Sequence, residues 1–106
     1  MAQDPKEGGG TLTKPRARGK LKPPPMWQVL LHNDDFTTQE FVVWVLRSVF
    51  HKPEAGAVRI MLAVHRRGKG VAGVYPKDVA ETRVAQVKRL AEAQEFPLLC
   101  TLEPEA

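Results

Sequence analysis

The sequence is almost free of cysteine, with Cys100 as its only one. A single cysteine cannot close an internal disulfide or build a zinc site from several thiolates. The sequence therefore argues against an oxidising compartment and against a fold built on cysteine-bound metal. We expect the protein to work in a reducing cytoplasm.

Long apolar runs are also missing from the sequence. No segment approaches the roughly 18 residues that a membrane span needs. Residues 1–10 are polar and glycine-rich and lack the apolar centre of an export signal, so no cleaved segment is expected. The 106 residues, of which 42% are hydrophobic and 26% charged, suit one small globular domain and exclude a multidomain enzyme.

Acidic side chains are scarce in residues 1–25, which hold six basic and two acidic residues, five prolines and four glycines. The net charge of this segment is +4, which equals the net charge of the whole chain, so residues 26–106 are balanced. A segment this poor in large apolar side chains cannot offset the entropy of ordering. The sequence predicts a disordered basic tail over 1–25 and a folded domain over 26–106.

Residues 26–32 form a mostly apolar run between prolines and an Asn-Asp-Asp turn, which predicts a strand. Thr37 and Glu40 have the spacing of a capping box and predict a helix start, and the sequence 51–53 ends that helix. The apolar stripe expected to face the core consists of Phe41, Val42, Val45, Leu46 and Val49.

The remaining pattern predicts a helix over 54–66 stopped by Gly68, a strand over 69–75, a helix from 76 or 77 to 94 and a strand over 98–102. The order is strand, helix, helix, strand, helix, strand. The mixture of helices and strands argues against a helical bundle, and three strands are too few for a β-sandwich. We expect an α+β two-layer domain of three helices and a three-stranded antiparallel sheet.

The densest polar cluster is the turn Asn33-Asp34-Asp35, which comes after the first predicted strand. Such residues often only cap local backbone groups in a turn. A metal-dependent hydrolase could instead use Asp34 and Asp35 with His32 and His65, but this spacing matches no compact ligand pattern. Cys100 lies in a predicted strand without a nucleophile motif. No catalytic site, metal or cofactor is expected.

The basic tail leaves a second class of function open, a nucleic-acid or ribosome-binding module. Binding of that kind would weaken steeply with salt and disappear when residues 1–25 are removed. The balanced charge of residues 26–106 argues against it, because a basic stripe is missing from the folded part.

Several separated motifs resemble the ClpS family of protease adaptors, and the resemblance covers residues 23–104. The motifs are Pro24-Pro25-Met26, Asn33-Asp34-Asp35-Phe36-Thr37, Glu40-Phe41-Val42-Val43, Met61-Leu62-Ala63-Val64-His65 with Gly68, Gly73-Val74-Tyr75, Val79-Ala80-Glu81-Thr82 and Pro97-Leu98-Leu99-Cys100-Thr101-Leu102-Glu103. The resemblance implies an adaptor that is not an enzyme. It would bind N-degrons, which are proteins whose first residue is Leu, Phe, Tyr or Trp, and deliver them to a ClpA- or ClpC-type unfoldase with the ClpP peptidase.

The resemblance also implies residue roles. Residues that would bind the substrate's free α-amino group are Asn33, Asp34 and His65. Residues that would line the pocket for its first side chain are Asp35, Thr37, Gln39, Val42, Met61, Val64 and Leu98. Residues that would contact the unfoldase are Asp78, Glu81, Thr82 and Arg83, and the tail would engage it during transfer.

Two positions depart from the family pattern. Gln39 stands where the family usually carries a methionine gate on the pocket, and His32 stands where an apolar residue is usual. The preference among first residues, such as Leu against Ile or Val, is therefore expected to differ from that of the family. The expected partners are N-degron substrates and the unfoldase, with no nucleic acid or membrane, and the chain is expected to be a monomer.

Overall fold

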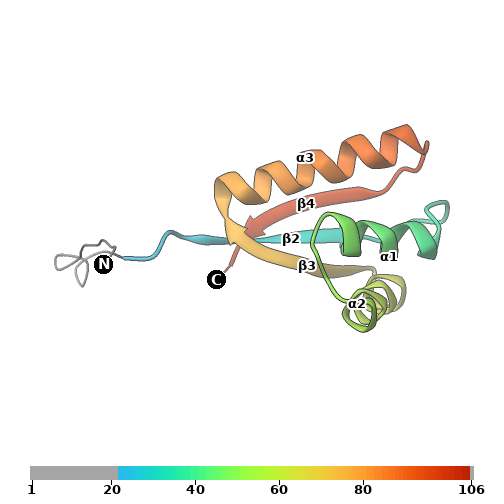
Figure 1. The fold of residues 1–106 in the computed structure, drawn as a ribbon, viewed down its shortest axis with the longest axis horizontal. Coiled ribbons are helices and arrows are strands. Elements are labelled where there is room, and N and C mark those ends of the chain that lie inside the picture. The colour runs from blue at the N-terminus through green and yellow to red at the C-terminus, as the bar shows by residue number, and fades with distance from the viewer. Residues whose placement is uncertain (1–21, 106) are drawn as a thin grey trace, which may run out of the picture.

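The computed structural model describes residues 22–105, which form three helices and one three-stranded antiparallel sheet (Figure 1). In chain order the elements are β2 (Met26–His32), α1 (Gln39–Ser48), α2 (Glu54–Arg67), β3 (Lys69–Pro76), α3 (Lys77–Ala93) and β4 (Leu99–Pro104). The predicted α+β architecture and element order are confirmed. The predicted tail lies outside the described residues except for 22–25, which form no helix or strand.

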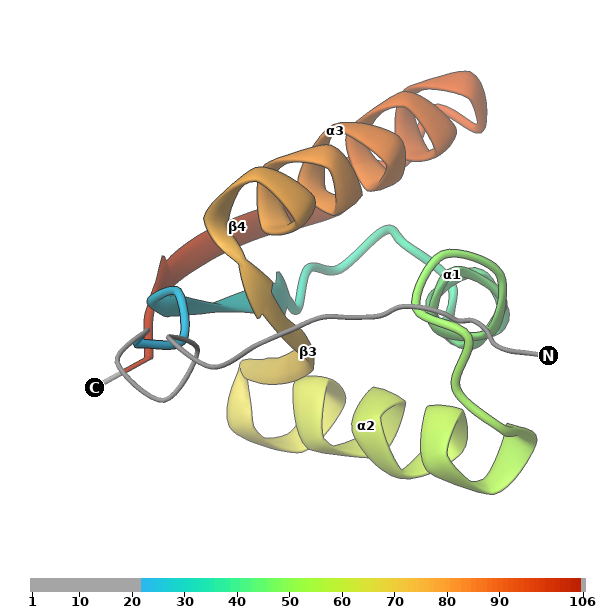
Figure 2. The ribbon, with the colours of Figure 1, turned by 60° about the vertical axis from the view of Figure 1, so that its left-hand side comes forward.

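The sheet has β2 in its centre, with β3 and β4 antiparallel on its two sides. The register shifts once, between Val29 and Leu30 opposite β3. Helix α3 runs beside β4, and α2 lies at the side of β3 (Figure 2). The turn after β2 therefore emerges at the end of the sheet where α1 and α2 approach each other.

One face of the sheet carries the core. Val29 and Leu31 of β2 are fully buried there, and side chains from all three helices pack against them. Leu30 points to the opposite face, as strand alternation requires. The members of this core cluster that come from the helices are Phe41, Val42, Val45, Leu46, Ala57, Met61, Val64, Ala80, Val87 and Ala91. The predicted stripe of α1 is therefore buried throughout.

The start of α1 differs from the predicted capping box. The N-cap is Thr38, whose hydroxyl accepts a hydrogen bond from the Phe41 amide at 3.1 Å. Thr37 turns back to Asp34 and does not cap the helix. The prediction of Thr37 with Glu40 is wrong by one residue, because two consecutive threonines offer two possible caps and the preceding carboxylate binds the first.

The other boundaries agree with the sequence within one or two residues. Helix α2 ends at Gly68, which has φ of 93° and donates its amide to Val64 at 2.9 Å. Only glycine adopts this left-handed conformation readily, so the predicted stop has a clear cause. Strand β4 begins at Leu99, one residue later than predicted, because Leu98 is buried in the core instead of pairing with β2.

Candidate functional site

The turn between β2 and α1 is organised around the carboxylate of Asp34. Its Oδ1 accepts the backbone amides of Phe36 and Thr37 at 2.8 and 2.7 Å, and its Oδ2 accepts the Thr37 hydroxyl at 2.8 Å. This is the local capping that Asp residues commonly perform in turns. A carboxylate offers about four acceptor positions, so one position on Oδ2 is left for a further donor.

The same contacts shift the pKa of Asp34. Burial alone would raise it, but the hydrogen bonds from the Thr37 amide, the Thr37 hydroxyl and the Phe36 amide outweigh burial and lower the pKa from its ordinary value of 3.8. Asp34 is therefore a carboxylate at neutral pH. It supplies a fixed negative charge in this turn.

The turn is tied to the last residues of α2. The Asn33 amide donates to the carbonyl of Gly68 at 2.9 Å, which holds the start of the turn against the end of that helix. His65 lies in the last turn of α2 and is exposed. The helix stop at Gly68 thus brings His65 to the same place as Asn33 and Asp34, which are far from it in the sequence.

A small cavity of about 290 Å³ opens where the turn, α1 and α2 meet. It corresponds to the volume of about ten water molecules, which suits one large side chain or a similarly small ligand. The lining residues are Asn33, Asp34, Asp35, Thr37, Gln39, Val42, Met61, Val64 and His65. These are nine of the ten residues that the resemblance implies for substrate binding.

The cavity has two chemically different sides. Asn33, Asp34 and His65 offer amide, carboxylate and imidazole groups, whereas Val42 and Met61 belong to the hydrophobic core and are nearly buried. A ligand with a polar head and a large apolar group would match both sides. The tenth residue, Leu98, does not line this cavity and packs in the core at 7% exposure.

Of the residues in the metal-hydrolase hypothesis, Asp34, Asp35 and His65 line this cavity, whereas His32 lies outside it. His32 shares a hydrogen bond of 2.8 Å with the Thr101 hydroxyl, across the β2–β4 pair and away from the cavity lining. Within residues 22–105, no three His, Cys, Asp or Glu side chains are grouped so that they could hold a metal ion. Burial raises the pKa of Cys100 to about 12, so its thiol is a poor nucleophile.

Helix α3 carries the four residues expected to contact an unfoldase. Asp78, Glu81 and Thr82 are exposed in its first turns and, at spacings of three and four residues, share one face. Arg83 is half-buried instead, with its guanidinium 5.7 Å from the ring centre of Tyr75 and a 3.2 Å hydrogen bond to Gln86.

Among the described helices, none is long and apolar enough to span a membrane.

The family model of the ATP-dependent Clp protease adaptor protein ClpS matches residues 22–101. The chain belongs to the ClpS family. It is therefore an adaptor of the Clp protease, and the family's description as an adaptor agrees with the expectation of a non-enzymatic protein.

Similar proteins extend over nearly the whole chain. The ATP-dependent Clp protease adapter protein ClpS of Myxococcus xanthus is 51% identical over 105 residues, covering 99% of this chain and 98% of its own. The ClpS of Desulfatibacillum aliphaticivorans is 55% identical over 106 residues, covering 99% and 100%. Among solved structures, Agrobacterium tumefaciens ClpS2 bound to L-phenylalaninamide is 41% identical with a TM-score of 0.75, covering 78% of this chain and 100% of that one.

Two features of the site were not predicted from the ClpS-like motifs. Gly68 was predicted only as a helix stop, although its carbonyl also anchors the polar turn. Trp44 lies outside the apolar stripe that the sequence predicts for α1, where only a contact with the tail or a partner was open to it, and it is 48% exposed on the helix next to the cavity, with its ring centre 5.7 Å from that of Phe41. Its position off the apolar stripe of α1 was the signal that it does not serve the core.

Proposed function

We propose that this Clp protease adaptor binds N-degrons, capturing the free α-amino group and the large apolar first side chain of Leu, Phe, Tyr or Trp. It would deliver them to a ClpA- or ClpC-type unfoldase that feeds ClpP. The observation that carries the proposal is the two-sided cavity, in which a carboxylate and an amide face nearly buried aliphatic side chains. The 41% identical ClpS2 bound to L-phenylalaninamide, a ligand with a free amine and an apolar side chain, supports it.

Recognition of the amine would rest on charge. A free α-amino group has a pKa of about 7.7 to 8.0, so it is largely an ammonium ion at neutral pH. The remaining acceptor position on Asp34 and the side chains of Asn33 and His65 would hold it, and charge-assisted hydrogen bonds are the strong ones. An acetylated or internal residue lacks this cation.

Recognition of the side chain would rest on burial. Val42, Met61 and Val64 present aliphatic surface to the cavity, and fully burying a Leu or Phe side chain contributes about 1.5 to 3 kcal/mol. Asp35, Thr37 and Gln39 would form the rim. Leu98 would act as part of the core that supports the pocket. Because amine and side chain must fit together, only a chain terminus satisfies both.

Delivery would use a second surface. The exposed face of Asp78, Glu81 and Thr82 on α3 lies apart from the cavity lining, so substrate and unfoldase could bind at once. Arg83 would contribute less than the other three, because its guanidinium is already engaged by Tyr75 and Gln86. The basic tail would engage the unfoldase during transfer.

A direct test is a fluorescence anisotropy titration with peptides that differ only at the first residue. We expect Leu, Phe, Tyr and Trp to bind and Ser, Gly and Glu to bind about 10- to 150-fold more weakly, since these lose the apolar burial. Similar affinities across the series would contradict the proposal.

The proposed contact predicts a definite pH dependence. Above pH 8 the peptide loses its ammonium charge, so affinity for a Phe-initiated peptide should fall about tenfold between pH 7 and pH 9. On the acid side, the lowered pKa of Asp34 keeps that carboxylate charged to lower pH than an ordinary aspartate. The charged form of Asp34 also stabilises the folded state. This stabilisation is fully present above the unfolded pKa of the carboxyl and is lost as the pH falls through its lower folded pKa.

The pH prediction is checked by titrating one peptide at constant ionic strength from pH 5 to pH 9.5. Circular dichroism spectra of the free protein across the same range are the control for pH effects on the protein itself. Equal affinity for the Phe-initiated peptide at pH 7 and pH 9 would rule out recognition of a charged amine.

The residue at the pocket rim is expected to set the choice among first residues. Gln39 is exposed at the start of α1 and lines the cavity, and its polar amide shapes and wets the rim differently from a methionine thioether. Gln39→Met should therefore change the Leu-to-Ile affinity ratio by about two- to fivefold. Glu40→Gln, one residue further on and outside this cavity, is the control, and an unchanged ratio in Gln39→Met would show that position 39 is no gate.

A further inference from the structure

A second cavity, of about 430 Å³, lies next to the first and shares two of its residues. Gln39 and Met61 line both cavities. From this shared wall the second cavity continues past Val43 and Trp44 of α1 and Val58 of α2. The first cavity takes one residue in the proposed function, so the adjoining one is placed to meet the next residues of the substrate.

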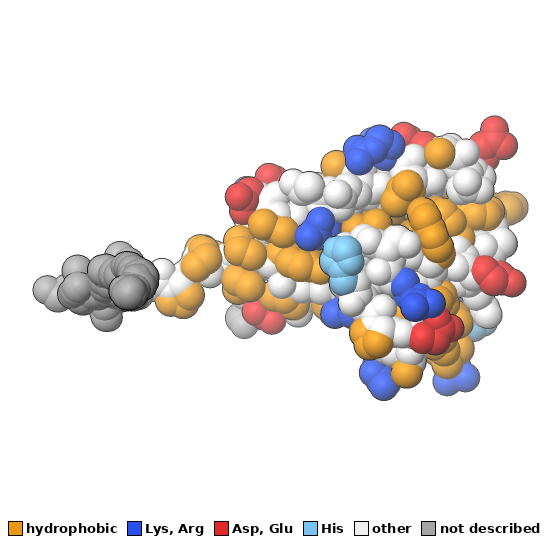
Figure 3. Space-filling view, in the orientation of Figure 1, with side chains coloured by type: hydrophobic (Ala, Val, Ile, Leu, Met, Phe, Trp, Pro, Cys, Tyr) orange, Lys and Arg blue, Asp and Glu red, His pale blue; other side chains and the backbone are white. Residues whose placement is uncertain are grey.

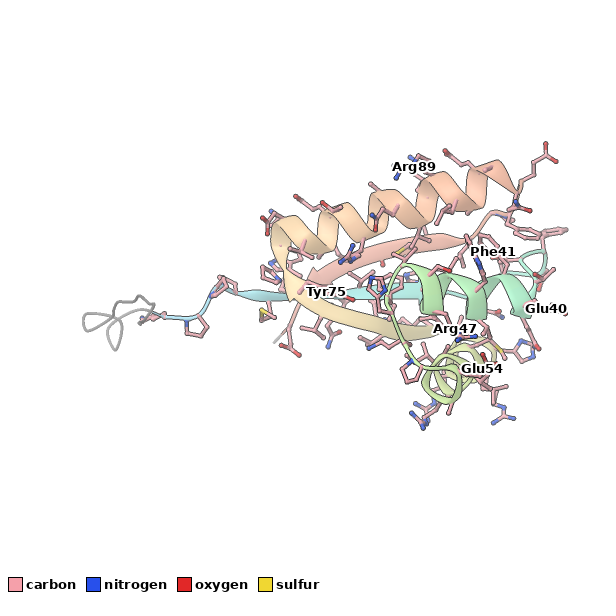
Figure 4. All side chains as sticks on the ribbon, in the orientation of Figure 1. Glu40, Phe41, Arg47, Glu54, Tyr75 and Arg89 are labelled. Atoms are coloured by element: carbon pink, nitrogen blue, oxygen red, sulfur yellow. The ribbon has the colours of Figure 1, made fainter. Side chains whose placement is uncertain are left out.

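The second cavity is apolar with a charged border. Val43 and Val58 are half-buried, and Trp44 is exposed over 48% of its surface although it is the largest apolar side chain of α1. Arg47 and Glu54 form an ion pair of 2.7 Å that borders the cavity (Figure 4). Figure 3 shows basic and acidic side chains side by side among hydrophobic ones on this face of the molecule.

The indole of Trp44 packs against another aromatic ring of the same helix. Its ring centre lies 5.7 Å from that of Phe41, which in turn lies 5.0 Å from that of Phe96 in an aromatic row. A large apolar side chain that is exposed and already packed against a neighbour loses less entropy when a ligand covers it. Trp44 is therefore suited to be a preformed wall of a binding groove.

The spacing of the lining residues along α1 is compatible with an extended peptide. Gln39 and Val43 are four residues apart on α1, which is about 6 Å along the helix axis. In an extended chain, residues one and three point to the same side and lie about 6.6 Å apart. For a chain that runs along α1 from the first cavity, the third side chain would thus lie over Val43, Trp44 and Val58, with the second side chain toward solvent.

We propose that the groove formed by Val43, Trp44, Val58 and Met61 is a subsite for the third residue of an N-degron and favours a large apolar side chain there. This inference rests on the proposed function and adds a second element of specificity to it. The substrate class that it names is a chain with a free terminus, a bulky apolar first residue and an apolar third residue.

The test compares three peptides that begin with Leu and carry a fluorescent label at the other end: Leu-Ser-Leu, Leu-Ser-Ser and Leu-Leu-Ser, each extended by the same polar sequence. With the unmodified full chain, Leu at position three should tighten binding by about threefold to tenfold over Ser, since the groove covers part of that side chain. Leu at position two should change affinity by less than about twofold.

Trp44→Ala should reduce the position-three preference to below about twofold while leaving the affinity for Leu-Ser-Ser unchanged. Val58→Ser on the opposite wall is the second variant, and Leu99→Ala, which removes an exposed leucine from β4 outside both cavities, is the control. An equal preference in the unmodified chain and in Trp44→Ala, or no preference in the unmodified chain, would overturn the subsite alone. Failure of all three free-amine peptides to bind would overturn the proposed function and this inference together.

Discussion

Asp34→Asn is expected to weaken binding of a Leu-initiated peptide by about 10- to 150-fold while the domain stays folded. A hydrogen bond to a charged group contributes about 1.5 to 3 kcal/mol, which corresponds to that factor. The asparagine keeps one oxygen that can accept the Phe36 and Thr37 amides, and its NH₂ group can donate to the Thr37 hydroxyl. The substitution therefore removes the charge and retains the turn.

Asp34→Ala would be a less specific test, because it also removes all three hydrogen bonds that organise the turn. The matched control is Glu92→Gln, which neutralises an exposed carboxylate on α3 outside both cavities and leaves those bonds intact. Isothermal titration calorimetry gives the affinities and circular dichroism checks the fold. If Asp34→Asn bound as tightly as the unmodified chain, the assignment of Asp34 to the amine would be wrong.

The largest effect on stability is expected from Leu31→Ala. Leu31 is fully buried near the end of β2, the central strand of the sheet, and belongs to the hydrophobic core that the helices cover. Truncating a buried leucine leaves a cavity and costs about 2 to 5 kcal/mol of the free energy of unfolding. A domain of this size has little stability in reserve, so the variant should be largely unfolded at moderate urea concentrations.

The matched control for that variant is Leu99→Ala. Leu99 pairs with the neighbouring residue His32 in the same sheet but is 54% exposed, so its truncation should change the free energy of unfolding by less than about 1 kcal/mol. Urea titrations followed by tryptophan fluorescence measure both. Equal losses of stability in the two variants would contradict the core assignment.

Much of the fold could be predicted because local signals agree with the tertiary structure. The apolar stripe of α1, the glycine that ends α2 and the prolines before β2 act through the nearest residues, which a sequence shows directly. The failures also have local causes. Thr37 and Thr38 are equally good caps, and the contact of Thr37 with Asp34 decides between them.

The site could be predicted only as far as the family motifs reach. Asn33, Asp34 and His65 are polar residues in ordinary positions, and the interpretation of Asp34 as a turn cap is correct in its own terms. What joins them is the bond from the Asn33 amide to the carbonyl of Gly68, which no periodicity predicts. The groove beside Trp44 escaped prediction for the same reason, because helical periodicity identifies the core face and says nothing of a shared wall between two helices.

The central claim is that the cavity at the β2–α1 turn recognises a charged chain terminus together with an apolar side chain. Calorimetric titration with L-phenylalaninamide and with its N-acetyl derivative tests this most directly, since the two ligands share the side chain and differ in the amine. We predict saturable one-to-one binding of the free amine that Asp34→Asn weakens, and binding of the acetylated ligand at least about 100-fold weaker. Equal binding of the two ligands would contradict the claim.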